Sequence, residues 1–261
     1  MTTREWNSQE YDRLSAPQHA WGVKVLERLR GRELPAGAPV LDAGCGTGRV
    51  TTELLSGFPG LAVVGADLSL NMLRTARQKL APRFGERVAL VSADLQRLPF
   101  VGTFGAVFST AVFHWVKDHD GLFRSIRDSL LPRGWLIAQC GGGPNLKKQR
   151  DRAREIQRRP EYAPFFAGWA EPWEYADEPA TFRRLEQAGF VCIRVWLEEA
   201  PTTLEDEETY RAFLENVTLH RILACLPATS LRETFLDEML ARADGDWSLD
   251  YWRLNIDAQK P

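Results

Sequence analysis

One stretch of the chain limits the possible folds more than any other. The apolar residues Val40 and Leu41 lead into Asp42 and then into a loop with three glycines at alternating positions, Gly44, Gly46 and Gly48. Glycine adopts φ values that other residues resist, so such a loop can turn sharply from a strand into a helix and can approach a ligand closely. The stretch therefore predicts the first strand, turn and helix of an α/β protein.

Two details of this loop bear on its ligand. The dinucleotide-binding fingerprint needs a further glycine at position 49, which is Arg49 here. The carboxylate of Asp42 would disfavour the pyrophosphate that such loops usually hold. The loop therefore predicts a ligand without phosphate, and it argues against a nicotinamide-dependent dehydrogenase.

Short apolar runs continue along the chain and alternate with amphipathic segments. The expected strands cover residues 40–42, 61–67, 88–92, 104–109, 135–139, 190–197 and 247–256. Strands that alternate with helices are typical of parallel sheets. We expect an α/β fold with a doubly wound, seven-stranded, mostly parallel sheet, in which the last strand is the antiparallel edge.

The same reading predicts one domain over residues 1–261. Its expected parts are an N-terminal helical segment at 1–37, a ligand-binding core at 38–140, and helical cover insertions at 141–178 and 202–243. Ser230 and Glu233 form a capping-box pattern at the start of the last predicted helix.

Two more carboxylates follow expected strands. Asp67 ends the second apolar run, where it can accept hydrogen bonds from both hydroxyls of a ribose. Asp94 ends the third run, where it can accept from an adenine amino group while Leu95 packs on the ring. Parallel sheets bind ligands beyond the carboxyl ends of their strands, so these residues are expected to converge with Asp42. The pattern predicts a cationic, adenosine-like ligand.

Composition excludes several other classes of protein. A formal net charge of −2 gives no field for a phosphate backbone, so nucleic acid is not an expected partner. The four cysteines form no CxxC pair, and His114 and His119 show no HExxH pattern, so no metal site is expected. No signal peptide or apolar run of membrane-spanning length is present, which predicts a cytoplasmic protein without membrane contact.

With these residues in view, the chain resembles the class I S-adenosylmethionine (AdoMet)-dependent methyltransferases over about residues 38–140. The family's motifs are similar to residues 41–48 (LDAGCGTG), 66–69 (ADLS), 93–95 (ADL), 104–109 (FGAVFS) and 131–136 (LPRGWL), in that order. The resemblance implies a Rossmann-like methyltransferase fold and AdoMet as cofactor. It implies cofactor contacts from Tyr11, Asp42, Gly44, Cys45, Gly46, Asp67, Leu68, Asp94 and Leu95.

Within that family the chain resembles the trans-aconitate methyltransferase group. The similarity lies at Trp6, at Tyr11 and in residues 113–119 (FHWVKDH). It implies methyl-ester formation on a small carboxylic acid. Trp6 and Tyr11 are expected to form a lid on the cofactor or to anchor the N-terminal helix.

The acceptor site is less defined by the sequence. His114 follows the fourth strand, where it can act as a general base or can pack in an aromatic run. The residues expected to contact the acceptor are Trp6, Phe113, Trp115 and Trp169. The arginines of residues 150–159 can hold a carboxylate, although such a run is more often a solvated helix face.

The leading hypothesis is therefore AdoMet-dependent O-methylation of a small carboxylic acid such as trans-aconitate, by a monomer or homodimer. The alternatives are O-, N- or C-methylation of another metabolite or natural-product precursor, and an AdoMet-binding partner protein without turnover. A carboxylate is already ionised at neutral pH, so the first reaction needs positioning rather than a base.

Overall fold

The computed structural model describes residues 16–261 of the chain, and these fall into two compact units. The first unit contains residues 16–143, 173–198 and 253–261, and the second contains residues 144–172 and 199–252. Trp6 and Tyr11 lie outside the described residues.

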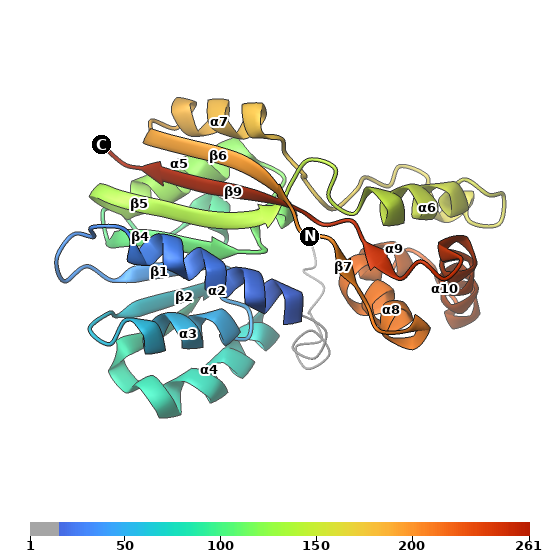
Figure 1. The fold of residues 1–261 in the computed structure, drawn as a ribbon, viewed down its shortest axis with the longest axis horizontal. Helices are drawn as coiled ribbons and strands as arrows, with labels where there is room; N and C mark the ends of the chain where they lie inside the picture. The colour runs from blue at the N-terminus through green and yellow to red at the C-terminus, as the bar shows by residue number, and fades with distance from the viewer. Residues whose placement is uncertain (1–15) are drawn as a thin grey trace. The chain divides into compact units, whose positions relative to one another are not determined.

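The first unit is built on a seven-stranded sheet in the order β3-β2-β1-β4-β5-β9-β6 (Figure 1). Its strands are β1 (Val40–Ala43), β2 (Val63–Asp67), β3 (Val88–Ser92), β4 (Phe104–Thr110), β5 (Leu130–Gly141), β6 (Val191–Glu199) and β9 (Trp252–Gln259). Strands β1 to β5 pair in parallel, and β9 pairs antiparallel to β5. The predicted α/β fold with a mostly parallel, seven-stranded sheet is confirmed.

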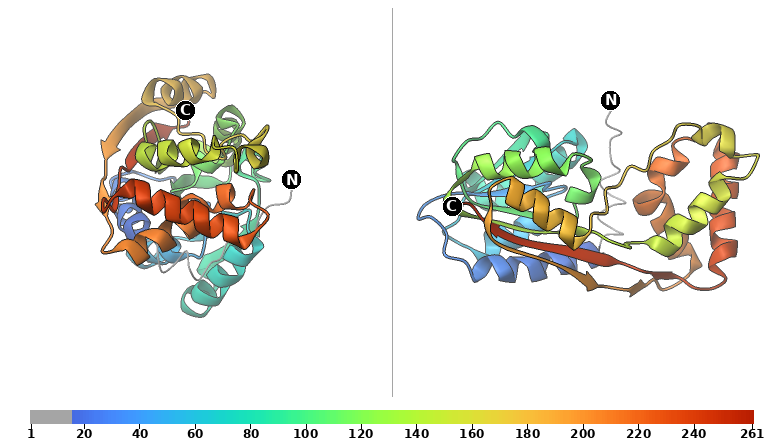
Figure 2. Two further views of the ribbon diagram at one scale, coloured as in Figure 1. Left: turned by 90° about the vertical axis from the view of Figure 1, so that its right-hand side faces the viewer. Right: turned by 90° about the horizontal axis from the view of Figure 1, so that it is seen from above.

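Helices cover both faces of this sheet (Figure 2). They are α2 (Ala16–Arg30), α3 (Arg49–Gly57), α4 (Leu70–Phe84), α5 (His119–Ser129) and α7 (Glu178–Gln187). Side chains of α2, α3 and α4 pack with Val40, whereas those of α5 and α7 pack with Leu41. Successive residues of a strand point to opposite faces, so β1 contributes to both cores.

The last strand differs in position from the prediction. It is antiparallel, as expected, but β9 lies between β5 and β6, so β6 rather than β9 forms the edge. Burial gives the physical reason, because residues 253–258 of β9 are all buried whereas β6 is largely exposed along its length. A strand whose two faces are both buried is typically an interior strand of a sheet rather than an edge strand.

The second unit is mainly helical. It contains α6 (Lys147–Gln157), α8 (Glu207–Phe213), a π-helical turn (Leu214–Thr218), α9 (His220–Leu223) and α10 (Thr229–Ala243). A two-stranded ladder joins β7 (Thr202–Thr203) to β8 (Ser248–Leu249). The expected capping box is wrong, because α10 begins at Thr229 and no side chain caps it.

A buried ionic network attaches α2 to the sheet. Arg28 donates to Asn255 Oδ1 at 2.6 Å and to the carbonyl of Ala138 at 2.6 Å. Asp257, only 2% exposed, lies 3.4 Å from Arg28 Nε and 2.7 Å from Arg32 Nη2. Removing one member of such a network leaves an uncompensated charge in the interior.

We therefore expect Asp257→Ala to lower the free energy of unfolding by about 3 kcal/mol. Asp128→Ala is the matched control, because Asp128 pairs with Arg127 but its side chain is 63% exposed. A surface pair contributes roughly 0.5 kcal/mol or less. Urea unfolding of both variants measures the difference, and equal losses would contradict a stabilising role for the buried network.

Candidate active site

The three glycines of the β1–α3 loop all have left-handed backbone conformations, with φ values of 83° at Gly44, 54° at Gly46 and 78° at Gly48. A Cβ at Gly44 would lie 2.2 Å from Val112, and one at Gly48 would lie 2.8 Å from Leu80. A Cβ at Gly46 would meet nothing within 4 Å. Packing thus requires Gly44 and Gly48, whereas Gly46 presents open backbone.

Asp67 joins this loop to the end of β2. Its Oδ2 accepts from the backbone amide of Gly46 at 2.9 Å, and its Oδ1 accepts from that of Ser69 at 2.9 Å. The amides of Gly44 and Cys45 both donate to the carbonyl of Ala66, at 2.7 and 3.0 Å. The ends of β1 and β2 are therefore held together by both backbone and side chain.

Asp42 lies beneath the glycine loop and is only 2% exposed. One of its oxygens accepts from the hydroxyl of Thr51 at 2.6 Å. Burial raises the pKa of Asp42 to about 7, with a smaller contribution from the charge of Asp67 and against the opposing effect of the Thr51 hydrogen bond. Burial also raises the pKa of the Cys45 thiol, which makes it a poor nucleophile.

The loop after β3 comes next to these groups in the sheet. Ser92 pairs with Asp67 in register, and the amide of Ala93 donates to the carbonyl of Asp67 at 3.2 Å. Asp94 caps a short 3₁₀ turn by accepting from the amide of Gln96 at 2.9 Å. Leu95 is 7% exposed, whereas Leu68 is 51% exposed beside Asp67.

Thus the structure brings Asp42, Asp67 and Asp94 to the carboxyl ends of three neighbouring parallel strands. Gly46, whose backbone is open on one side, and the exposed apolar side chain of Leu68 lie at the same carboxyl ends of the strands. Carboxylates at a sheet edge favour a cationic or hydroxyl-bearing ligand, and an exposed leucine offers apolar contact to a ring.

Four aromatic rings, which we call the aromatic cluster, lie beside the end of β4. His114 and Trp115 follow this strand, and Trp173 and Tyr175 come from the segment before α7. His114 stacks on Tyr175 with ring centroids 5.6 Å apart, and Tyr175 stacks on Trp173 at 6.0 Å. Trp115 lies 5.2 Å from His114 and 6.1 Å from Trp173. Side chains about sixty positions apart in the sequence thus form one aromatic surface beside the end of β4.

Hydrogen bonds fix His114 within this cluster. Its Nδ1 accepts from the backbone amide of Gly141 at 3.2 Å, and its own carbonyl accepts from the amide of Glu174 at 2.8 Å. Burial lowers the pKa of His114 well below its usual value, and the charge of Arg253 adds to this effect. The ring is therefore neutral at pH 7, with its proton on Nε2.

A polar lattice supports the segment that carries Trp173 and Tyr175. His119 Nε2 contacts the carbonyl of Phe113 at 3.0 Å, and its Nδ1 lies 3.1 Å from an Arg184 nitrogen. Arg184 also reaches Glu174 at 3.4 Å, and Lys117 donates to the carbonyl of Trp173 at 3.0 Å. This lattice could not be predicted from the sequence, because its members come from three separate segments.

The structure places the expected acceptor contacts in three different environments. Phe113 is 1% exposed and packs against Phe123 in the core, so its ring has no surface for a ligand. Trp115 belongs to the aromatic cluster. Trp169 belongs to the second unit, where it packs against Phe166 with ring centroids 5.8 Å apart.

The basic run of α6 is mostly neutralised within the second unit. Arg154 pairs with Glu171, Lys148 with Asp246, and Arg159 with Glu238. These pairs support the reading of the run as a charged helix face over that of a free carboxylate-binding cluster.

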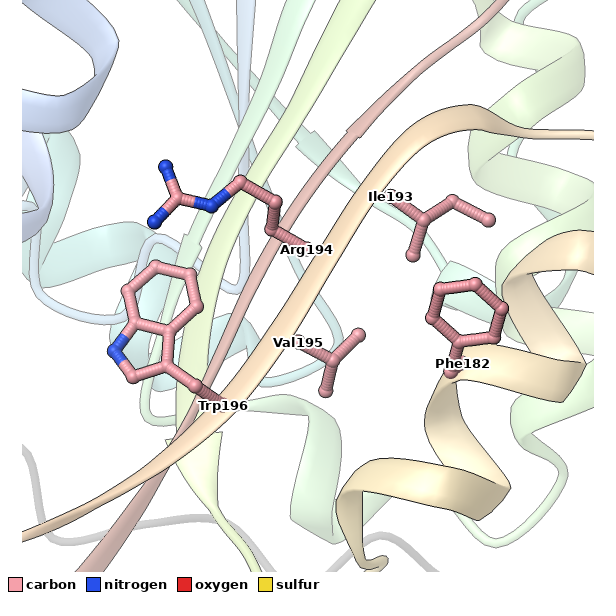
Figure 3. A pocket seen from close by; sticks show the side chains of 5 residues that line it. All are labelled: Phe182, Ile193, Arg194, Val195 and Trp196. Atoms are coloured by element: carbon pink, nitrogen blue, oxygen red, sulfur yellow. The ribbon is translucent and has the colours of Figure 1, made fainter.

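A shallow groove of about 330 Å³ lies at the other side of the sheet, along edge strand β6 (Figure 3). Ile193, Val195 and Phe182 line one face of the strand, and Arg194 and Trp196 lie on the opposite face. Strands β9 and β5 separate β6 from the strand ends described above, so the groove is distinct from that site.

Within residues 16–261, no group of His, Cys, Asp and Glu side chains is arranged to hold a metal ion. No helix of this part of the chain is long and apolar enough to cross a membrane.

The raised pKa of Asp42 leads to a prediction about stability. The folded state binds the Asp42 proton up to about pH 7, far above the ordinary pKa of 3.8, so ionisation of Asp42 destabilises the fold as the pH rises between these values. Asp42→Asn keeps an oxygen for Thr51 but carries no charge. We expect the stability of the variant relative to the parent to rise by roughly 2 kcal/mol between pH 5 and pH 8, measured by denaturant unfolding. A pH-independent difference would rule out this titration.

Comparison with known proteins agrees with the fold. A model described as "Methyltransferase domain" matches residues 41–138. The trans-aconitate 2-methyltransferase of Rhizobium meliloti is 30% identical over 227 residues, which cover 86% of this chain and 84% of the relative. That of Methylobacterium nodulans is 28% identical over 98% of this chain and 91% of the relative.

Other relatives match over less of their own length. A malonyl-[acyl-carrier protein] O-methyltransferase of Legionella pneumophila is 34% identical over 143 residues, and the chain spans 49% of that protein. Among solved structures, a Haemonchus contortus phosphoethanolamine N-methyltransferase has a TM-score of 0.62 at 21% identity, covering 97% of this chain and 57% of its own. A methyltransferase of Bacillus halodurans has a TM-score of 0.63 at 16% identity, covering 92% and 99%.

The sheet order, the glycine loop with its strand-end carboxylates, and these near-complete sequence matches lead to one conclusion. The chain belongs to the class I AdoMet-dependent methyltransferases and is similar to their trans-aconitate 2-methyltransferase group.

Proposed function

We propose that this methyltransferase transfers a methyl group to a carboxylate oxygen of a small acid, forming a methyl ester. One observation carries the proposal: the acceptor nitrogen of His114 is already used by the amide of Gly141. A hydroxyl or amine acceptor needs a group that removes a proton, whereas a carboxylate does not. The relatives named for trans-aconitate and malonyl acceptors support the same chemistry.

The residues at the strand ends fit AdoMet as the cofactor. Gly46 leaves room for close approach to its backbone, and Asp67 lies where its carboxylate can accept from ribose hydroxyls. Leu68 offers an exposed apolar surface to the adenine, with Asp94 available to its amino group. Asp67 favours a ligand that carries positive charge, as does Asp42 in its ionised form.

When bound, AdoMet supplies a methyl group on a sulfonium, and its transfer to oxygen leaves the electron pair of the broken carbon–sulfur bond on sulfur. The protein's task is then to hold the acceptor oxygen in line and to keep water away. In our proposal the aromatic cluster does this, with Trp115 and Tyr175 as half-buried walls beside the end of β4. Aromatic faces also favour a neighbouring cation.

Transfer of label from methyl-labelled AdoMet to a panel of small carboxylic acids, phenols and amines tests the proposal. We expect label on an acid such as trans-aconitate, and we expect mild alkali to release it, because methyl esters hydrolyse readily. Alkali-stable label on a phenol, an amine or carbon would instead support the alternative, methylation of another metabolite.

A second prediction concerns the cofactor. Gly46→Ala adds a methyl group on the open side of the loop, so we expect AdoMet binding to weaken about tenfold or more. Gly102→Ala is the matched control, because Gly102 has a φ of 52°, close to the 54° of Gly46, and equally open surroundings. Gly102 precedes β4 and therefore lies at the amino ends of the parallel strands, away from the candidate site.

Calorimetric titration with AdoMet, with thermal unfolding of each variant, separates binding from strain. Both variants are expected to lose similar stability, of order 1 kcal/mol, from a left-handed alanine. Unchanged AdoMet affinity in Gly46→Ala would place the cofactor elsewhere.

A further inference from the structure

The backbone amide of Gly141 holds His114 in one tautomer, and the aromatic cluster holds its ring in one orientation. The Gly141 amide is a donor, so Nδ1 must offer its lone pair at 3.2 Å and cannot carry the proton. Tyr175 and Trp115 pack against the ring, and the backbone carbonyl of His114 is tied to the amide of Glu174. The ring cannot turn without breaking these contacts.

The consequence lies at the other ring nitrogen. In the neutral tautomer Nε2 carries a hydrogen, and no group of residues 16–261 pairs with it. The residue is 7% exposed. Nε2 itself is not fully enclosed, so its N–H is accessible to a ligand that accepts a hydrogen bond.

The environment also selects the kind of acceptor. After burial, the charge of Arg253 is the largest influence on the imidazole, and it too lowers the pKa of His114. Protonation of His114 is opposed by burial, by Arg253 and by His119, so the ring acts as a constant donor rather than as a titrating group. A fixed N–H donor suits an anionic oxygen, because a hydrogen bond to an ionised acceptor is stronger than one to a neutral acceptor.

We propose that the Nε2–H of His114 donates a hydrogen bond to the carboxylate of the methyl acceptor, and that His114 selects acids by this bond rather than acting as a general base. This inference rests on the proposed function, since it assigns a role within carboxylate methylation. No proton moves in the step, so the donor remains unchanged throughout turnover.

Three variants separate the possible roles of His114. His114→Gln keeps an amide donor near the position of Nε2 and a carbonyl that cannot titrate, whereas His114→Phe keeps the ring packing without donor or base. The acid that accepts most label in the panel serves as the substrate. Ser129→Ala controls for general effects of a buried substitution, because Ser129 directly precedes β5 at the amino ends of the strands and its buried hydroxyl donates to the carbonyl of Ile126.

We expect His114→Gln to retain kcat/KM for the acid within about tenfold. We expect His114→Phe to lose about 10- to 100-fold, mainly through a higher KM for the acid, with AdoMet affinity unchanged. Equal and large losses of kcat in both variants would point to a base and overturn the proposal. Parallel losses of AdoMet affinity and thermal stability would point to packing alone and would also overturn it.

Nitrogen-15 NMR of the histidine-labelled full chain gives a readout that needs no substrate. His114→Gln identifies the signal, which is expected to show a neutral ring protonated at Nε2 from pH 6 to pH 8. A ring protonated at Nδ1, or an imidazolium near pH 7, would overturn the inference even if the enzyme forms esters. Absence of alkali-labile product with the expected NMR signal would instead refute the proposed function and leave the tautomer standing.

Discussion

The forked hydrogen bond from the amides of Gly44 and Cys45 to the carbonyl of Ala66 fixes where the chain leaves the first strand. Since Gly44 also lies against Val112, this one turn aligns the ends of β1, β2 and β4. Every other element of the candidate site takes its position from that alignment. Asp67 can bridge two loops only because those loops begin at the same level of the sheet. The register of the strands thus determines where the site lies, and the functional side chains depend on that register.

Local sequence patterns predicted the parts of the molecule that depend on local physics. The run from Val40 to Gly48 defines a strand and a turn by itself, because apolar burial and positive φ values are set within nine residues. The first five strands and the placement of Asp67 and Asp94 at strand ends follow from the same alternation of strands and helices. Parallel pairing of these strands then places the carboxylates together at the carboxyl ends of the strands.

Features that depend on distant partners could not be predicted in this way. The tautomer of His114 is set by Gly141, twenty-seven residues away, and its stacking partner Tyr175 comes from a segment whose aromatic composition gave no register. Phe113 and His114 are neighbours in sequence, yet one ring enters the core and the other stays at the sheet end. Both belong to one short helical turn, Phe113–Trp115, and no pattern of apolar residues encodes the direction of that turn.

The interior position of β9 has a consequence for the making of the protein. Strand β6 (Val191–Glu199) leaves the ribosome well before β9 (Trp252–Gln259), which must finally lie between it and β5. During that interval the nascent chain holds an unpaired edge on β5 and a free strand able to occupy it wrongly. Insertion of β9 then requires β5 and β6 to remain unpaired or to separate again. Residues 202–243 are synthesised between β6 and β9, and their synthesis sets the length of the interval in which β6 can pair wrongly with β5.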